Sequence, residues 1–378
     1  MTPKLRFQGF HDKWATFKLK EVAEIVTGST PPTSDKTNYG GSYLFLSPAD
    51  INSGDIIDSS KKLSLKGWQW VRQIPLDSVV FVCIGSTIGK CGIVKRDFST
   101  NQQINSLIPN EDIDTTFLYS LLLKNASKIK KLAGVQAVPQ LNKSVFSALR
   151  FNFPSYPEQE KIGLLITSLD NKINLLTKKK EALETYKKGL MQKIFSQGFR
   201  FKREDGTDYP DWEWIALEDI LDYEQPTKYI VSSTEYDDSY NTPVLTAGKT
   251  FVLGYTNEAN GIFSQTPIIL FDDFTTDFKF VNFPFKVKSS AAKILKLKRS
   301  ADMLYVHEAM HTIKFPRGEH KRYWISEFSK MEIPFPTLDE QIKFSALIQS
   351  TNAMLEVNEK LLRSSSRLKK GLLQQMFV

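Results

Sequence analysis

The sequence predicts an α+β protein in which two strand-rich globular regions alternate with two long helices, and three observations lead to this fold class. The chain of 378 residues is 41% hydrophobic, which is enough apolar material for two or three packed domains. A nine-residue segment, residues 187–195, returns in closely similar form as residues 369–377. Between the long segments lie short apolar stretches bounded by glycine, proline, asparagine or aspartate, which are typical of strands.

The repeat extends well beyond those nine residues. The same shift of 182 positions carries four earlier residues onto later ones, namely Pro154, Glu158, Gln159 and Lys161 onto Pro336, Glu340, Gln341 and Lys343. A second correspondence, shifted by 198 positions, joins residues 14–22 to residues 212–220. We therefore predict a pseudo-two-fold internal repeat. Its parts are a globular domain over 1–153, a helix over 154–197, a second globular domain over 198–335 and a helix over 336–378.

Each constant segment begins after an acidic turn and continues for about forty residues without proline, which predicts a helix about 60 Å long. The first copy places leucine or isoleucine at every seventh residue, and the second does so with leucine or methionine: Ile162, Leu169, Leu176, Leu183 and Leu190, then Leu347, Met354, Leu361 and Leu368. We expect an antiparallel coiled coil in which Leu169 meets Leu368 and Leu176 meets Leu361, with polar layers between them. Two unpaired amphipathic helices in separate domains are the alternative.

The globular regions are expected to contain strands at residues 79–84, 267–271 and 278–283. A short helix is predicted near residues 116–131, with its counterpart near 302–313, and each should lead into the strand that precedes a long helix.

Composition limits the classes of function. A net charge of +8 and a pI near 9.1 favour a polyanion, above all nucleic acid, as the partner. The sequence shows no run of about 18 apolar residues and no secretion signal, so we expect a cytoplasmic protein without a membrane partner. Cys83 and Cys91 are too few for a disulfide framework and are expected to be free thiols.

One motif resembles that of a zinc protease. His307, Glu308 and His311 match the pattern H-E-x-x-H, in which two imidazoles bind zinc and the glutamate activates water. Lys314 and Arg317 occupy the positions where the extended motif has glycine and a third histidine, and the counterpart helix carries leucine and asparagine. We therefore predict no metal site and interpret the histidines as a solvated or DNA-facing pair, with a zinc-dependent hydrolase as the alternative.

Residues 85–90 resemble a phosphate-binding loop, but only three residues separate the glycines and Cys91 replaces the hydroxyl that would bind magnesium. A plain loop between strands is the favoured interpretation, with Lys90 facing a DNA phosphate as the alternative. We find no convincing setting for a nucleophile or a methyl-transfer loop, so no catalytic residues are predicted.

Basic residues alternate with aromatic residues at 314–324 and again near residues 33–41. Such segments can hold phosphates while amides and guanidinium groups contact base edges, although each could equally be a solvated loop. The predicted DNA-contacting residues are Ser29, Thr30, Lys36, Lys90, Asn101, Gln102, Lys249, Lys279, Arg317, His320, Lys321 and Arg322.

From end to end the chain resembles the specificity subunit of Type I restriction-modification systems. In the first half the resemblance rests on residues 3–7 with Trp14, 27–31, 87–90, 101–102, 138–142 and 154–162. In the second half it rests on residues 320–326, 336–341 and 369–377. One departure is that residues 223–226 replace the Thr-Gly-Ser-Thr-Pro stretch of the first half, so the second set of recognition loops is expected to be built differently.

The resemblance implies that the globular regions are target-recognition domains, each reading one half of a bipartite sequence in double-stranded DNA, while the long helices set the distance between the two halves. It implies that the chain has no active site and holds two methyltransferase subunits, joined by restriction subunits that translocate DNA. S-adenosylmethionine, ATP and magnesium would then bind those partners, and this chain would bind no cofactor. A coiled-coil scaffold that does not bind DNA is the alternative. Apolar helix residues are the candidates for docking the partners, unless they only widen the coiled-coil seam: Ile166, Ile173, Ile194, Ile348, Leu355 and Met376.

Overall fold

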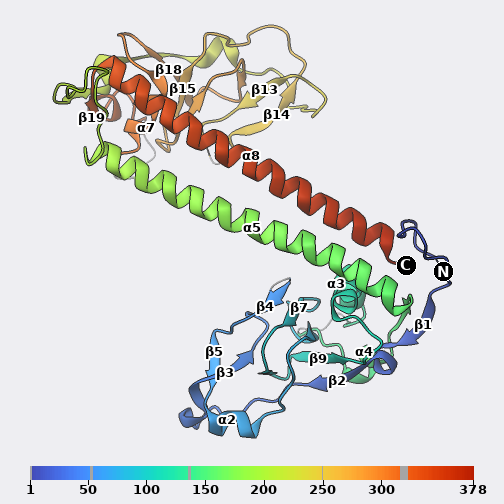
Figure 1. Ribbon diagram of the computed structural model, residues 1–378. Helices are drawn as coiled ribbons and strands as arrows, with labels where there is room; N and C mark the ends of the chain where they lie inside the picture. The colour runs from blue at the N-terminus through green and yellow to red at the C-terminus, as the bar shows by residue number, and fades with distance from the viewer. Residues whose placement is uncertain (1, 52–53, 135–137, 249, 316–321) are drawn as a thin grey trace. The chain divides into compact units, whose positions relative to one another are not determined.

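The computed structural model describes residues 2–51, 54–134, 138–248, 250–315 and 322–378. Its internal contacts divide the chain into two compact units. Unit 1 contains residues 1–180 together with 358–378, and unit 2 contains residues 181–357. Each unit combines sheets with helices (Figure 1), which confirms the predicted α+β class. Both long helices cross the boundary between units, and the predicted four-part division remains a prediction.

Unit 1 is built on a five-stranded sheet flanked by a three-stranded one. The five-stranded order is β2 (Ala23–Thr27), β9 (Ile104–Pro109), β6 (Ser78–Val82), β7 (Cys91–Val94) and β4 (Asp55–Ile56). The smaller sheet contains β5 (Lys61–Leu63), β3 (Tyr39–Leu46) and β8 (Phe98–Thr100), and β1 (Ala15–Lys18) pairs with β10 (Arg150–Phe153). Its helical segments are α1 (Leu19–Val22), η1 (Lys36–Asn38), α2 (Leu65–Trp70), α3 (Thr115–Lys131) and α4 (Lys143–Ser147).

The central strand of unit 1 is buried on both faces. Phe81 packs in the same core as Phe117 of α3, whereas Val80 and Val82 belong to a second core on the opposite face. Because successive side chains of a strand point to opposite faces, a strand covered on both sides has a continuous apolar sequence. This explains the unbroken apolar run that predicted the strand.

Unit 2 follows a related plan. Its four-stranded sheet has the order β12 (Leu221–Glu224), β18 (Ala292–Leu297), β15 (Ile268–Asp272) and β16 (Phe278–Val281). A three-stranded sheet contains β14 (Val252–Thr256), β13 (Thr242–Leu245) and β17 (Lys286–Val287), and β11 (Glu213–Ala216) pairs with β19 (Glu332–Phe335). Its helical segments are α6 (Leu217–Ile220), η2 (Pro226–Tyr229), α7 (Met303–Met310) and η3 (Phe328–Lys330). The predicted strands correspond to β6, β15 and β16, and the predicted short helices to α3 and α7.

The two long helices are α5 (Tyr156–Phe195) and α8 (Leu338–Met376). Within unit 1 their segments are antiparallel, because positions later in α5 meet positions earlier in α8. Asn358 Nδ2 donates to the carbonyl of Leu176 at 2.9 Å, and further along Lys369 pairs with Asp170. Among the described residues, no helix is long and apolar enough to cross a membrane.

A buried glutamate near the start of each long helix binds an arginine from a segment that lies far away in the sequence. Arg6 binds Glu158 through two hydrogen bonds of 2.8 and 2.6 Å, and Arg200 binds Glu340 through two of 3.2 and 2.9 Å. Both carboxylates are almost fully buried, at 1% and 0% exposure. A planar guanidinium matches a carboxylate in this two-pronged geometry, so the same clamp recurs in both units.

The glutamine that follows each glutamate holds a short helix in place. Gln159 Oε1 accepts from the backbone N–H of Asp114 at 3.1 Å, while its Nε2 donates to the carbonyl of Pro154. Gln341 makes the same two bonds, to Asp302 and Pro336, both at 2.8 Å. Both aspartates are N-caps, of α3 and α7 respectively. The repeated Pro-x-x-x-Glu-Gln motif therefore joins a strand, a short helix and a long helix.

The repeated motif at the end of each long helix closes a core. Phe377 stacks on Phe117 in unit 1, with ring centroids 5.1 Å apart, and Phe195 packs on Tyr305 in unit 2 at 5.8 Å. A glycine within the motif, Gly189 or Gly371, lies in the interior of the helix and does not end it.

The predicted pairing of leucines is wrong for α8. Met354, Leu361 and Leu368 are 54%, 46% and 54% exposed, and the buried residues are instead Thr351, Asn358 and Ser365. Core residues near each end of the helix fix its rotation: Phe344 is buried in unit 2 and Met376 in unit 1. With the rotation of α8 fixed in this way and 3.6 residues per turn, the polar residues Thr351, Asn358 and Ser365 lie on its inward side. On α5 the predicted row is correct in part, since Ile162 and Leu169 are buried.

We expect Arg6→Ala to destabilise unit 1 by about 3 kcal/mol, because it leaves a buried carboxylate without its counter-charge. Arg200→Ala should cost unit 2 less, because Trp212 Nε1 still donates to Glu340 at 3.0 Å. Its equivalent in the described part of unit 1, Trp14 Nε1, has no acceptor. Hydrogen exchange measured by mass spectrometry can follow each unit separately. Equal losses in the two variants would contradict this account.

Candidate nucleic-acid interface

The loop after β2 brings four of the predicted DNA-contacting residues together. Gly28 leaves no room for a side chain, since a Cβ there would lie 2.2 Å from the carbonyl oxygen of Asn101. The segment around Gly28 therefore lies close against residues 100–101, and Ser29 N–H donates to the carbonyl of Thr100 at 2.9 Å. Thr30 Oγ1 then donates to Gln102 Oε1 at 2.7 Å. Ser29, Thr30, Asn101 and Gln102 therefore form one polar surface, which we call the amide loop.

The sequence analysis missed two basic residues here: Arg72, which supports the amide loop, and Lys66, which holds the segment that follows it. Arg72 donates from its backbone N–H to Ser29 Oγ at 3.0 Å and from Nη1 to the carbonyl of Thr27 at 2.6 Å. Lys66 pairs with Asp35 at 2.7 Å and, with Thr37, lowers the pKa of that carboxyl to about 2. The predicted Lys36 is exposed beside this pair. Basic residues alternating with tryptophans across α2 were the available signal.

The other motifs of the first half converge near the same loop. Gly85 and Gly89 have φ values of +97° and +98°, which favour glycine in a tight turn. Gly85 N–H donates to the carbonyl of Pro139 at 2.9 Å, and Cys83 N–H donates to that of Gln103 at 2.8 Å. Strand β7 follows the turn, whereas a phosphate-binding loop opens a helix. The structure therefore supports the interpretation of residues 85–90 as a loop between strands.

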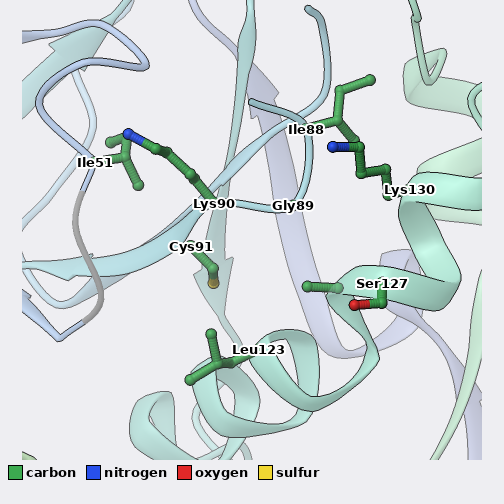
Figure 2. Close-up of a pocket in the computed structure, with 9 residues that line it drawn as sticks. Ile51, Ile88, Gly89, Lys90, Cys91, Leu123, Ser127 and Lys130 are labelled. Atoms are coloured by element: carbon green, nitrogen blue, oxygen red, sulfur yellow. The ribbon is translucent and has the colours of Figure 1, made fainter. Parts of the chain in front are cut away.

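Lys90 is held by the protein. Its Nζ donates to the carbonyl of Pro48 at 3.1 Å, and Lys130 donates in the same way to Ser86 at 3.1 Å. Both side chains line a pocket of about 440 Å³ whose floor includes Cys91 (Figure 2). The ammonium group of Lys90 thus already has a partner, and it is a weaker phosphate candidate than the exposed Lys36.

In unit 2 the described candidates are Lys279 and Arg322. Lys279 lies half-buried on β16, and the exposed Arg322 places its guanidinium 5.9 Å from the ring centroid of Phe274. Asp273 fixes the chain after Arg322 by accepting from the N–H groups of the next two residues, at 2.9 and 2.8 Å. Asp273 is itself buried against Lys293 at 3.3 Å. Lys249, Arg317, His320 and Lys321 lie outside the described residues.

Where unit 1 has the amide loop, unit 2 has a carboxylate. Glu224 ends β12 and accepts hydrogen bonds from Lys296 Nζ and Tyr229 Oη, both at 2.8 Å. Helix η2 follows at once. The two units therefore differ in local chemistry at equivalent positions, as the departure from the Thr-Gly-Ser-Thr-Pro stretch indicated.

The predicted docking residues are largely inaccessible. Four of them are at most 2% exposed and two are half-buried: Ile166, Ile194, Ile348 and Met376, then Ile173 and Leu355. Ile166 and Met376 belong to the core of unit 1, and Ile194 belongs to that of unit 2. The structure thus corrects this choice for the four buried residues, whereas Ile173 and Leu355 stay predictions.

The histidine pair also requires a correction. His307 is only 9% exposed and packs edge-on against Phe278, with ring centroids 5.4 Å apart. Glu308 beside it is 7% exposed. The expectation of a solvated or DNA-facing pair is therefore wrong for His307.

Comparison with known proteins adds independent findings. Residues 11–185 match the model of the Type I restriction modification DNA specificity domain. The chain is 50% identical over 147 residues to the Escherichia coli EcoR124I/EcoR124II specificity subunit, which is 36% of this chain and 35% of that one. It is 23% identical to the putative MjaX specificity subunit of Methanocaldococcus jannaschii, over 96% of this chain and 92% of that one. Other relatives from this archaeon are matched over about half of their length.

The fold has a counterpart among solved structures. The S subunit of the Type I restriction-modification system from M. genitalium aligns with a TM-score of 0.72 over 100% of this chain and 99% of that chain. Sequence identity in this alignment is only 16%, so the likeness concerns the fold.

We expect both cysteines to be inert in the native protein. Burial raises the pKa of Cys83 to about 12 and raises that of Cys91 further, so the reactive thiolate is scarce at neutral pH. A chromogenic disulfide reagent at pH 8 should label less than about a tenth of a thiol per native chain and both thiols after denaturation. Rapid labelling of the native chain would contradict the burial.

Proposed function

We propose that this chain is a member of the specificity-subunit family of Type I restriction-modification systems, whose domain model matches residues 11–185, and that it selects a split DNA sequence on which other chains act. The observation that carries the proposal is the duplicated anchor. The same glutamate clamp and glutamine bridge hold a recognition unit in both halves of the chain, while the loops on the two units differ. Two similar frames with unlike loops suit the reading of two unlike half-sites.

In unit 1 the amide loop would contact base edges. Gln102 is exposed and carries both a donor and an acceptor, which suits it to the paired hydrogen-bonding groups of a base in the major groove. Lys36, whose side chain is exposed, would bind a phosphate and help to position the loop, since contacts with the DNA backbone carry no sequence information.

In unit 2 the reading residues would be of another kind. Arg322 is exposed on a segment that the buried Asp273 holds in place, and an arginine can contact guanine through two hydrogen bonds. Glu224, paired with Lys296, occupies the position of the amide loop and offers acceptors only, whereas the amide loop also offers donors. The second half-site should therefore be read through a different surface from the first.

We assign no catalytic group to this chain, and we propose that it acts in the cytoplasm. The segments that resemble catalytic motifs lack the features that catalysis needs. The glycine turn at residues 85–90 leads into a strand, and the sequence shows no methyl-transfer loop. S-adenosylmethionine, ATP and magnesium would accordingly bind to methyltransferase and restriction subunits, and the chain would direct their chemistry.

For the methyltransferase subunits we propose one docking surface on each unit. Unit 1 exposes Leu175 and Leu368, at 67% and 54%, and unit 2 exposes Val357 and Tyr186, at 58% and 56%. The shift of the repeat, 182 positions, relates Leu175 to Val357 and Tyr186 to Leu368. Large exposed apolar side chains that recur at equivalent positions suit a partner that binds twice.

Exchange of residues 15–153 for the corresponding region of a homologue should change only one half of the modified sequence. This range keeps β1 and β10 together, because Ala15 lies opposite Phe153 in their ladder. The test is to map methylated adenines in cells that also express the methyltransferase subunit. A change in both halves, or in neither, would refute the division between units.

Leu368→Glu should remove one methyltransferase copy from the complex, Tyr186→Glu the other, and the double variant both. A charge placed in an apolar contact must be desolvated, so each affinity should fall by about tenfold or more. Native mass spectrometry of the purified complex gives the stoichiometry. Ser366→Glu, on the opposite flank of α8, is the matched control and should retain two copies. Full assembly of the double variant would exclude these surfaces.

A further inference from the structure

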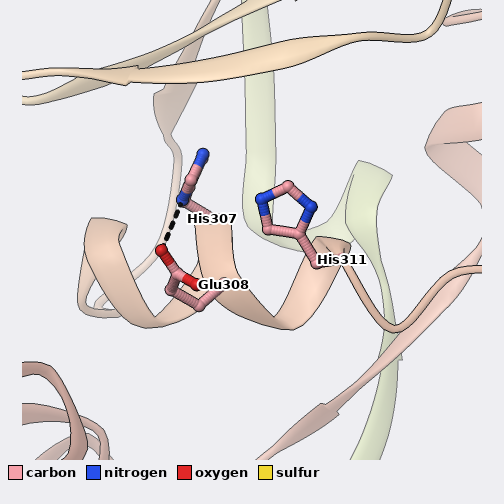
Figure 3. A group of neighbouring side chains, drawn as sticks. All are labelled: His307, Glu308 and His311. Atoms are coloured by element: carbon pink, nitrogen blue, oxygen red, sulfur yellow. Dashed lines mark hydrogen bonds and ion pairs between the residues drawn. The ribbon is translucent and has the colours of Figure 1, made fainter. Parts of the chain in front are cut away.

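Helix α7 carries a group of potential metal ligands that the function proposed above does not use. His307, Glu308 and His311 each offer one ligand atom, and the three atoms lie within 4.8 Å of one another. His307 Nδ1 and Glu308 Oε1 are 3.3 Å apart. Figure 3 shows the ring of His311 beside that of His307, with one nitrogen turned towards it.

The surrounding side chains hold the rings in this arrangement. Positions four apart face the same side of a helix, so the two imidazoles are neighbours, with centroids 5.0 Å apart and planes at 89°. Phe278 packs against both rings, at 5.4 Å from His307 and 4.5 Å from His311, and Phe280 contacts His307 at 5.9 Å. The rings are thus confined before any ligand binds.

We propose that His307, Glu308 and His311 bind one divalent transition-metal ion of the zinc type. At metal–ligand distances of about 2.0–2.1 Å, two ligands of a tetrahedral ion lie roughly 3.3 Å apart. The separation of His307 Nδ1 and Glu308 Oε1 already has this value, and a rotation of the His311 ring can bring in the third ligand. Two imidazoles and one carboxylate form a common ligand set for zinc.

Nearby charges select the kind of ion. Glu308 and His311 line a pocket of about 730 Å³, and Lys187 and Lys314 line it as well. These ammonium groups oppose a hard cation that binds through charge alone, such as magnesium or calcium. An ion held through imidazole nitrogens depends less on local charge, and Glu308 supplies a compensating one. The open pocket leaves room for water as the fourth ligand.

The ion would stabilise structure and take no part in hydrolysis. In a zinc protease the glutamate of the motif is a free base, whereas Glu308 here is bonded to His307 and serves as a ligand. All three ligands lie at the C-terminal end of α7, where the helix dipole favours a cation. Helix α3 carries Leu121, Leu122 and Asn125 at the equivalent positions, so the site belongs to unit 2 alone.

The test is to titrate the metal-free full-length chain with Zn²⁺ by calorimetry and with Co²⁺ by visible absorption. We expect one equivalent to bind, with the absorption of a low-coordinate cobalt site, and α7 but not α3 to gain protection from hydrogen exchange. His311→Asn and Glu308→Gln keep side-chain size and should weaken binding by about tenfold or more. His11→Ala, which removes an exposed histidine near the N-terminus, is the control and should leave binding unchanged.

Several outcomes would overturn the site: no binding by the folded chain, unchanged affinity in His311→Asn, or loss of binding in His11→Ala. Circular dichroism of each variant separates loss of a ligand from loss of folding. The proposal stands independently of DNA recognition, because methylated-adenine mapping reports on one and metal titration on the other.

Discussion

The structure depends on two carboxylates that are buried near the first turns of the long helices. Glu158 and Glu340 are removed from water, and each is acceptable there only because an arginine reaches it from a segment far away in the sequence. The next residue, a glutamine, then holds the N-cap of a short helix and the end of a strand. One pair of side chains thus sets where a helix starts and how a globular unit is attached to it.

This constraint also explains the unusual seam between the helices. Since the ends of α8 are set by core residues, the residues between them face inward whether or not they are apolar. Asn358 and Thr351 are buried as a result, and Lys369 crosses to Asp170. Polar groups inside a helix pair cost stability but oppose slippage, because another register would leave them without partners. Such a fixed register would suit the role that the resemblance implies for the helices, which is to set the distance between two half-sites.

The fold could be predicted largely from the sequence because its anchors are repeated. A glutamate and glutamine at a constant distance from Lys-Lys-Gly-Leu are visible without coordinates. The rotation of α8 was not visible, because Leu361 and Asn358 differ by only about 60° around the helix and packing at its ends decides between them. At the candidate interface, Thr30 and Gln102 could be found from their motifs. The alternation of basic residues with tryptophans marks Arg72 as a candidate, but its bond across the fold to Ser29 is visible only in the structure.

Unit 1 is discontinuous in the chain, and this affects how the protein is made. Its globular part is complete by residue 180, but its partner helix segment begins only at residue 358. Phe117 therefore waits for Phe377, which is translated only after the whole of unit 2. Throughout synthesis of unit 2, the nascent first half keeps an apolar surface uncovered and is exposed to misassembly or to chaperones. A nonsense mutation just upstream of Phe377 would leave that surface open permanently, so its effect should extend to the half of the protein that was translated first.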